Sequence, residues 1–245
     1  MNIPIYKKTG PVILMFIHVF VFCQIANAQY EKLYPPFTKW YQDPFGLRPV
    51  ELSSATGFIW GALTATACLI FTQKDPAFQK KISFYQESGV GFGYKPPYTL
   101  AFQNNTGLLY KIREWMAVGI EWNVLHFSDN TNNTWAFGTR PFARWYAVTG
   151  KKASLFFEYG AGLSYSLKRF PLTGTGWETD TARTGTKFNF ITKYGIGTEI
   201  HLSKRLWLQA GIRHFHLSNG NLRGIQRNPS HDSNGVFLGF IYARS

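Results

Sequence analysis

Cysteine is scarce in this chain: only Cys23 and Cys68 occur among its 245 residues. Cys23 lies in an N-terminal apolar run that we expect to be removed, so the mature chain would keep Cys68 alone. An intrachain disulfide is then excluded. Because a soluble secreted domain more often carries paired cysteines, this scarcity disfavours a disulfide-stabilised domain.

Acidic residues are also few, with 13 Asp and Glu against 26 Lys and Arg and a formal net charge of +13. A basic chain can bind nucleic acid, but the sequence has no basic-aromatic groove motif of that kind. Nucleic acid is therefore not expected as a partner.

Long apolar runs are rare, and the clearest one stands near the N-terminus. Lys7 and Lys8 precede "PVILMFIHVFVFCQ" (11–24), which is followed by "IANAQ" (25–29). A basic region, an apolar region and a small-x-small site form a signal peptide, here residues 1–28 with cleavage after Ala28. The run is short for a spanning helix, and no basic stop signal follows it. Cleavage removes two lysines and no acid, which lowers the formal charge by two.

Aromatic residues and glycine are plentiful, at 18% and 23 residues, which suits a β-rich chain. From about residue 81 onward the apolar residues recur with a period of two. In "ASLFFEYGAGLSYSL" (153–167), one face is apolar and the other is small or polar. Several such stretches exceed ten residues, about the length that crosses a membrane with tilt. We predict an all-β fold, an antiparallel transmembrane β-barrel with eight strands near 82–94, 97–103, 108–127, 134–147, 153–168, 187–200, 206–218 and 233–243.

The predicted connections alternate in length. Those at 148–152 and 201–205 are short, whereas those at 128–133, 171–185 and 219–232 are longer and polar. Short periplasmic turns and long outer loops are typical of outer-membrane barrels. We therefore expect an exported protein embedded in the bacterial outer membrane, with residues 81–245 as the barrel.

Residues 29–80 do not follow this pattern. The uncharged stretch "SSATGFIWGALTATACLIFTQ" (53–73) is apolar on all sides and carries Gly57 and Gly61 at small-xxx-small spacing. A helix and an extra pair of strands both fit it. The sequence leaves this extension open.

The end of the barrel carries the residues that point to chemistry. Alternation along 206–218 and 233–243 places His216, Ser218 and Asp232 on the outward face, at the loop ends of neighbouring strands. A serine becomes a nucleophile when a base takes its proton, and a third group orients the base. Asn219 and Asn228 are candidate donors to a developing oxyanion.

"HLSNG" (216–220) with "NPSHD" (228–232) resembles the outer-membrane lipid A 3-O-deacylases of the PagL type. Members of that family are eight-stranded barrels that hydrolyse an ester-linked acyl chain of lipid A. The resemblance implies His216 as base, Ser218 as nucleophile and Asp232 as the acid that orients the histidine. It also implies lipopolysaccharide in the outer leaflet as the partner and an esterase without a cofactor. A homodimer is left open.

Other interpretations compete with catalysis. The chain can be a non-catalytic structural or adhesion barrel, or a phospholipase-like esterase. His214, His216 and Asp232 suggest a zinc site, but too few further ligands accompany them, and no metal is expected. We interpret His214 as an interfacial side chain and His231 as a loop residue.

Basic residues near the predicted outer loops suit an anionic glycolipid. They lie in "SLKRF" (166–170) and at Arg183 and Arg223. Arginine and lysine bind phosphate oxygens well, so these residues are candidates for contact with lipid A phosphates.

Overall fold

The computed structural model describes residues 81–95, 97–128, 133–171, 184–224 and 227–243, together with Leu63, Thr66, Ile70 and residues 78–79. The expected signal peptide lies outside these residues. Of the extension at 29–80, the three isolated residues have helical backbone, and the choice between helix and strands stays open. Within the described part of the chain, no helix is both long and apolar enough to cross a membrane.

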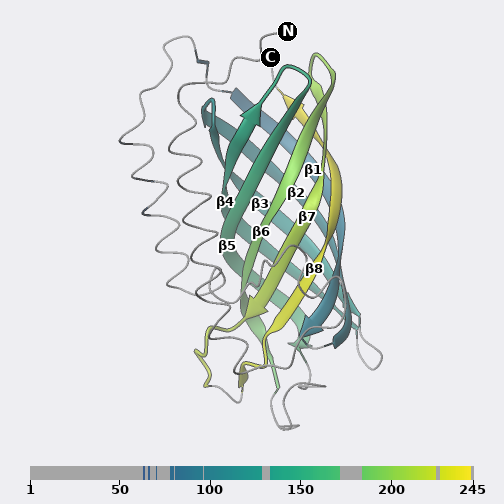
Figure 1. Ribbon diagram of the computed structural model, residues 1–245. Helices are drawn as coiled ribbons and strands as arrows, with labels where there is room; N and C mark the ends of the chain where they lie inside the picture. Colours follow the sequence, from purple (N-terminus) through teal and green to yellow (C-terminus); the bar gives the residue numbers. More distant parts are fainter. Residues whose placement is uncertain are drawn as a thin grey trace, which may run out of the picture.

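Eight antiparallel strands close into a barrel in which each strand pairs with its sequence neighbours and β8 pairs with β1 (Figure 1). This confirms the predicted fold class. The strands are β1 (Lys81–Lys95), β2 (Pro97–Arg113), β3 (Met116–Ser128), β4 (Asn133–Thr149), β5 (Ala153–Phe170), β6 (Thr186–Ser203), β7 (Leu206–Ser218) and β8 (His231–Ala243).

The connections define the two ends of the barrel. The β2–β3, β4–β5 and β6–β7 turns are short and lie at the end where β8 finishes, while the β5–β6 and β7–β8 loops are long and lie at the other end. The long connections after β5 and β7 agree with the sequence prediction, whereas β1 and β2, which meet at the same end, are separated by one residue, and the β3–β4 connection spans only 129–132. One predicted boundary was wrong. We expected residues 104–107 to connect the second and third strands, but β2 continues through them, and the turn falls at Glu114 and Trp115.

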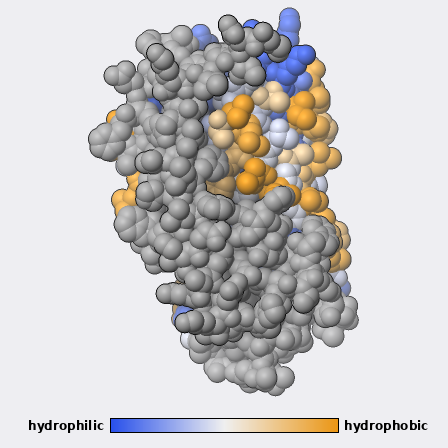
Figure 2. All heavy atoms as spheres, in the orientation of Figure 1, coloured by the Kyte–Doolittle hydropathy of each residue, from blue (hydrophilic) through white to orange (hydrophobic). Residues whose placement is uncertain are grey.

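The barrel wall is apolar on its outer surface. On β8, Val236, Leu238 and Phe240 are exposed, whereas Phe237 and Ile241, at alternate positions, are buried in the interior. Figure 2 shows hydrophobic side chains over the part of the wall that is in view, with hydrophilic ones at its upper end. Such a belt suits the hydrocarbon layer of a membrane.

Aromatic side chains fill both ends of the lumen. Near the long loops, Phe127 stacks on Phe170 with ring centroids 4.1 Å apart. Toward the short turns, Tyr85 packs edge-on against Phe142 at 5.9 Å. The interior therefore has a packed layer at each end.

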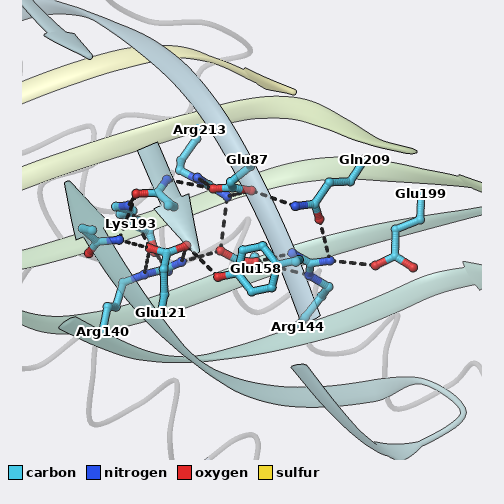
Figure 3. A network of polar contacts seen from close by, with 12 residues as sticks. Glu87, Glu121, Arg140, Arg144, Glu158, Lys193, Glu199, Gln209 and Arg213 are labelled. Atoms are coloured by element: carbon cyan, nitrogen blue, oxygen red, sulfur yellow. Dashed lines mark hydrogen bonds and ion pairs between the residues drawn. The ribbon is translucent and has the colours of Figure 1, made fainter. Parts of the chain in front are cut away.

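The middle of the lumen holds a charged layer, whose polar contacts are drawn in Figure 3. Glu121 accepts hydrogen bonds from Arg140 Nε at 3.1 Å and Lys193 Nζ at 2.8 Å, and Glu158 accepts one from Arg144 Nη2 at 2.7 Å. The layer is balanced, because four acids face four bases: Glu87, Glu121, Glu158 and Glu199, and Arg140, Arg144, Lys193 and Arg213. Buried charges persist when they are paired in this way. The lumen consequently holds no net charge from these eight residues.

Candidate active site

The β7–β8 hairpin brings the predicted catalytic residues together. His216 and Asp232 are direct partners in the antiparallel register. Side chains of such partners project from the same face of the sheet, with Cβ atoms about 5 Å apart. The face is the outer one, because the alternating pattern of β7 places its buried Phe215 and Leu217 in the lumen. The structure thus places His216 and Asp232 side by side on the outside of the barrel.

A short hydrogen bond joins the two residues. Nδ1 of His216 lies 2.6 Å from Oδ1 of Asp232, and the side chains are 16% and 9% exposed. A neutral imidazole that donates its Nδ1–H to a carboxylate keeps Nε2 unprotonated. Nε2 of His216 is thereby available as a base.

Ser218 ends β7 on the same face, two residues beyond His216, and is half-buried. Two strand residues span about 6.5 Å, so its hydroxyl lies within side-chain reach of the imidazole. Both residues are described, and no hydrogen bond joins them in this structure. Catalytic hydrogen bonds are often long until substrate binds.

The chain turns sharply after Ser218. Gly220 and Asn221 both adopt positive φ angles, of 62° and 61°. Glycine takes this conformation freely, and asparagine tolerates it better than most other residues. The turn brings the Gly220 N–H to 3.4 Å from Ser218 Oγ. This backbone donor was missed in the sequence, although the "NG" pair signals a turn of this kind.

Asn219 and Asn228, the candidate oxyanion donors, make hydrogen bonds within the loop in this structure. Asn219 is buried, and its side-chain amide donates to the Arg227 carbonyl and, at 3.4 Å, to Thr186 Oγ1. Oδ1 of Asn228 accepts the Asn219 N–H at 2.9 Å. The two amides therefore hold the loop that follows the serine. Neither amide donates to Ser218 within the described residues.

His214 is not an exposed interfacial side chain, contrary to expectation. It is buried, its Nδ1 lies 2.9 Å from Asn234 Oδ1, and its Nε2 lies 3.5 Å from Asp232 Oδ1. The ring packs 4.8 Å from that of Tyr194. Asp232 therefore lies between two histidines.

The same three residues are the ones that suggest a metal site. His214, His216 and Asp232 offer ligand atoms within 4.8 Å of one another. A tetrahedral zinc ion with bonds of about 2.0 Å needs its ligand atoms about 3.3 Å apart. The 2.6 Å contact between His216 and Asp232 is a hydrogen-bond distance instead. The geometry fits a histidine–carboxylate pair better than a metal centre.

His231 lies in the lumen rather than in a loop. It is the first residue of β8, is fully buried, and has Phe127 and Phe170 ring centroids 5.4 Å away. It packs with the aromatic layer and takes no part in the cluster on the outer face.

Several solved structures resemble this barrel. The outer membrane enzyme PagL is 16% identical with a TM-score of 0.46, covering 63% of this chain and 97% of its own. Neisserial surface protein A is 9% identical with a TM-score of 0.45, covering 66% and 96%. The N-terminal β-barrel domain of Pseudomonas aeruginosa OprF is 13% identical with a TM-score of 0.39, covering 67% and 100%. No curated protein sequence matches the chain.

A family model provides the assignment. The model described as lipid A 3-O-deacylase (PagL) matches residues 89–240, which is more than half of the chain and includes the whole β7–β8 hairpin apart from its last residues. The chain therefore belongs to the PagL family and is a lipid A deacylase of the bacterial outer membrane.

Proposed function

We propose that the protein hydrolyses the 3-O-linked acyl ester of lipid A with Ser218 as nucleophile, His216 as base and Asp232 as the orienting acid. The observation that carries this proposal is the 2.6 Å contact between His216 Nδ1 and Asp232 Oδ1, on the same face as Ser218. A carboxylate in this position fixes the tautomer of the imidazole and stabilises the imidazolium that forms.

The first half of the reaction acylates the enzyme. Nε2 of His216 takes the Ser218 proton while Oγ attacks the ester carbonyl, and the Gly220 N–H stabilises the developing oxyanion. The tetrahedral intermediate then collapses. The C–O bond to the sugar breaks, and His216 returns the proton to the leaving hydroxyl oxygen.

The second half frees the enzyme. His216 takes a proton from water, and the resulting hydroxide attacks the Ser218 ester. Collapse releases the fatty acid and returns the proton to Ser218 Oγ. The products are one fatty acid and a lipid A with one more free hydroxyl group, and no redox step or cofactor enters the balance.

The position of the site suits a lipid substrate. His216 and Ser218 face outward at the end of the barrel that carries the long loops. In an outer-membrane barrel this end lies in the outer leaflet. Lipid A can therefore reach Ser218 laterally from the membrane without entering the lumen.

Mass spectrometry of lipid A after incubation with the refolded protein tests the proposal. We expect the wild type to release one hydroxyacyl chain, and Ser218→Ala or His216→Ala to reduce the rate by about 10³-fold or more. Ser203→Ala and His201→Ala are matched controls, because both residues are exposed at the end of β6 that is far from Ser218. Heat-modifiable migration on a gel verifies that each variant is folded.

The other outcomes identify the alternatives. Intact lipid A with folded wild type, together with cleavage of glycerophospholipids, supports a phospholipase-like esterase. Intact substrate of both kinds supports a non-catalytic barrel. Release of a chain from another position refutes the 3-O assignment and leaves the triad in place.

The homodimer that the sequence left open has a candidate surface. Three polar residues are exposed near the middle of the lipid-facing wall: Gln86 and Ser88 of β1 and Asn104 of β2. Ser88 and Asn104 are neighbours in the strand register. Polar groups without partners are costly in hydrocarbon. A second copy of the chain at this face gives them hydrogen-bonding partners.

A further inference from the structure

The net charge of the protein does not come from the charged layer of the lumen. The eight ionised residues of the charged layer cancel one another. The formal charge of +13 is therefore carried by residues elsewhere in the chain. Where these cations gather decides what they attract.

The outer end of the barrel is basic in its described part. Of the described acidic residues, Glu114 lies in the β2–β3 turn at the opposite end, and Asp232 is hydrogen-bonded to His216. The remaining four, Glu87, Glu121, Glu158 and Glu199, lie in the lumen. Lys168, Arg169, Lys187 and Arg223 are exposed at the outer end. Within the described ranges, no carboxylate at that end neutralises them.

Three cations at this end, Lys187, Arg223 and Arg227, line one pocket. It has a volume of about 390 Å³ and lies between the outer ends of β5 and β6 and the β7–β8 loop. Its lining consists of Tyr165, Thr186, Lys187, Phe188, Asn219, Leu222, Arg223 and Arg227. Lys168 and Arg169 do not line it. The pocket thus combines an apolar floor with basic groups.

An aromatic surface connects this pocket to the nucleophile. Phe190 is the register partner of Ser218, and its ring contacts that of Phe188 with centroids 6.1 Å apart. Phe188 in turn pairs with Tyr165 across β5 and β6. All three aromatic side chains are 37% to 50% exposed on the outer face. This aromatic surface therefore runs across the outer face from Tyr165, in the pocket, to Phe190, next to Ser218.

The cations of the pocket differ in how they are held. Arg227 donates to Thr184 Oγ1 at 2.7 Å and to the Gly185 carbonyl at 3.2 Å, and no carboxylate among the described residues pairs with its guanidinium. Lys187 and Arg223 are exposed and make no ion pair within the described residues. Two exposed cations and one hydrogen-bonded cation around a small pocket suit a phosphate, since arginine and lysine bind its oxygens through charge-assisted hydrogen bonds.

We propose that this pocket binds the phosphorylated sugar of the substrate, with Lys187, Arg223 and Arg227 on the phosphate and the Tyr165–Phe188–Phe190 surface under an acyl chain. The inference rests on the proposed function, because it takes Ser218 as the reacting group. It makes the phosphate a determinant of specificity: an anionic acylated sugar binds, and the same lipid without phosphate binds weakly.

Binding to a catalytically inactive protein tests the inference. Full-length Ser218→Ala protein in detergent micelles is titrated by calorimetry with bisphosphorylated lipid A and with the same lipid after enzymatic removal of its phosphates. We expect Lys187→Gln/Arg223→Gln, added to the Ser218→Ala protein, to weaken binding of the phosphorylated lipid at least tenfold. Lys168→Gln/Arg169→Gln is the control, because it removes the same charge from the same end outside the pocket. The phosphate-free lipid should bind all three proteins equally weakly.

Two results overturn the inference. One is equal affinity of the Ser218→Ala protein for lipid A with and without phosphate, and the other is equal weakening by the two double variants. Phosphatidylglycerol micelles form a third arm. Binding of this phospholipid as tight as that of lipid A, and equally sensitive to Lys187→Gln/Arg223→Gln, indicates general attraction of anionic lipids and also refutes a sugar-phosphate site.

Binding is measured without turnover, so failure here is distinct from failure of the proposed mechanism. A deacylase whose affinity ignores phosphate keeps the mechanism and loses the subsite. A phosphate-dependent binder that releases no acyl chain from lipid A keeps the subsite and loses the mechanism.

Discussion

Nε2 of His214 lies 3.5 Å from Oδ1 of Asp232, the same oxygen that contacts His216 at 2.6 Å. The first histidine is buried, and its other ring nitrogen is 2.9 Å from Asn234 Oδ1. Asp232 is therefore packed on one side against a residue that does not itself reach Ser218. A side chain that restricts the carboxylate also restricts the imidazole bonded to it.

His214→Phe should lower kcat about tenfold, which corresponds to about 1.4 kcal/mol of transition-state stabilisation, and leave KM nearly unchanged. The reason is that Asp232 loses a contact that limits its rotamers, while the substrate surface is untouched. Steady-state kinetics on lipid A measure both constants, with His201→Phe as the control at the far end of the barrel. A rise in KM at constant kcat contradicts a positioning role, and an unchanged kcat removes it.

Asp232→Asn should reduce kcat by about 10³- to 10⁴-fold, because an amide cannot stabilise the imidazolium and favours the wrong tautomer of His216. Asp232→Glu keeps the charge but adds a methylene to a carboxylate that already lies at 2.6 Å. It should retain more activity than Asn and less than wild type. The kcat values of the two variants give the comparison, and equal activity of Asn and wild type excludes the acid from the triad.

Much of the site follows from the alternation of strands and from residue type. His216, Ser218 and Asp232 are found on one outer face because β7 and β8 keep strict period-two geometry up to their loop ends. Residue type alone does not reveal what each amide bonds to. Asn219 and Asn228 are natural oxyanion donors by chemistry, yet the loop closes through them, and a loop conformation depends on contacts with Arg227 and Thr186.

The misplaced β2–β3 turn has a comparable cause. "NNTG" (104–107) consists of residues that favour turns. In the barrel, Asn105 points into the lumen and donates to Glu87 Oε1 at 2.9 Å. At Gly107 an added Cβ would lie 2.7 Å from Tyr85 Cε1, so glycine leaves room for that ring. The conformation of both residues depends on contacts with neighbouring strands. The local sequence does not contain those contacts.

Glu121→Gln should destabilise the barrel by about 3–5 kcal/mol, since it leaves Arg140 and Lys193 buried without their common acid. Unfolding in urea, followed by tryptophan fluorescence in detergent, measures the change. Lys151→Gln removes an exposed charge from the β4–β5 turn and should stay within about 0.5 kcal/mol of wild type. A Glu121→Gln barrel as stable as this control shows that the charged layer contributes little to stability.

Gln86→Leu/Asn104→Leu should shift the protein toward the monomer and raise the dimer dissociation constant about tenfold. Both side chains are exposed near mid-height of the lipid-facing wall, where leucine is more soluble in hydrocarbon than an amide. The monomer itself should therefore lose no stability, which separates loss of association from loss of folding. Sedimentation in detergent measures the association, and urea unfolding measures the fold. Thr139→Val, a polar-to-apolar change on the outer face of β4, is the control. If the double variant dimerises as strongly as the wild type, the interface lies on another face. If the wild type sediments as a monomer at every concentration, Gln86 and Asn104 face lipid without a partner copy.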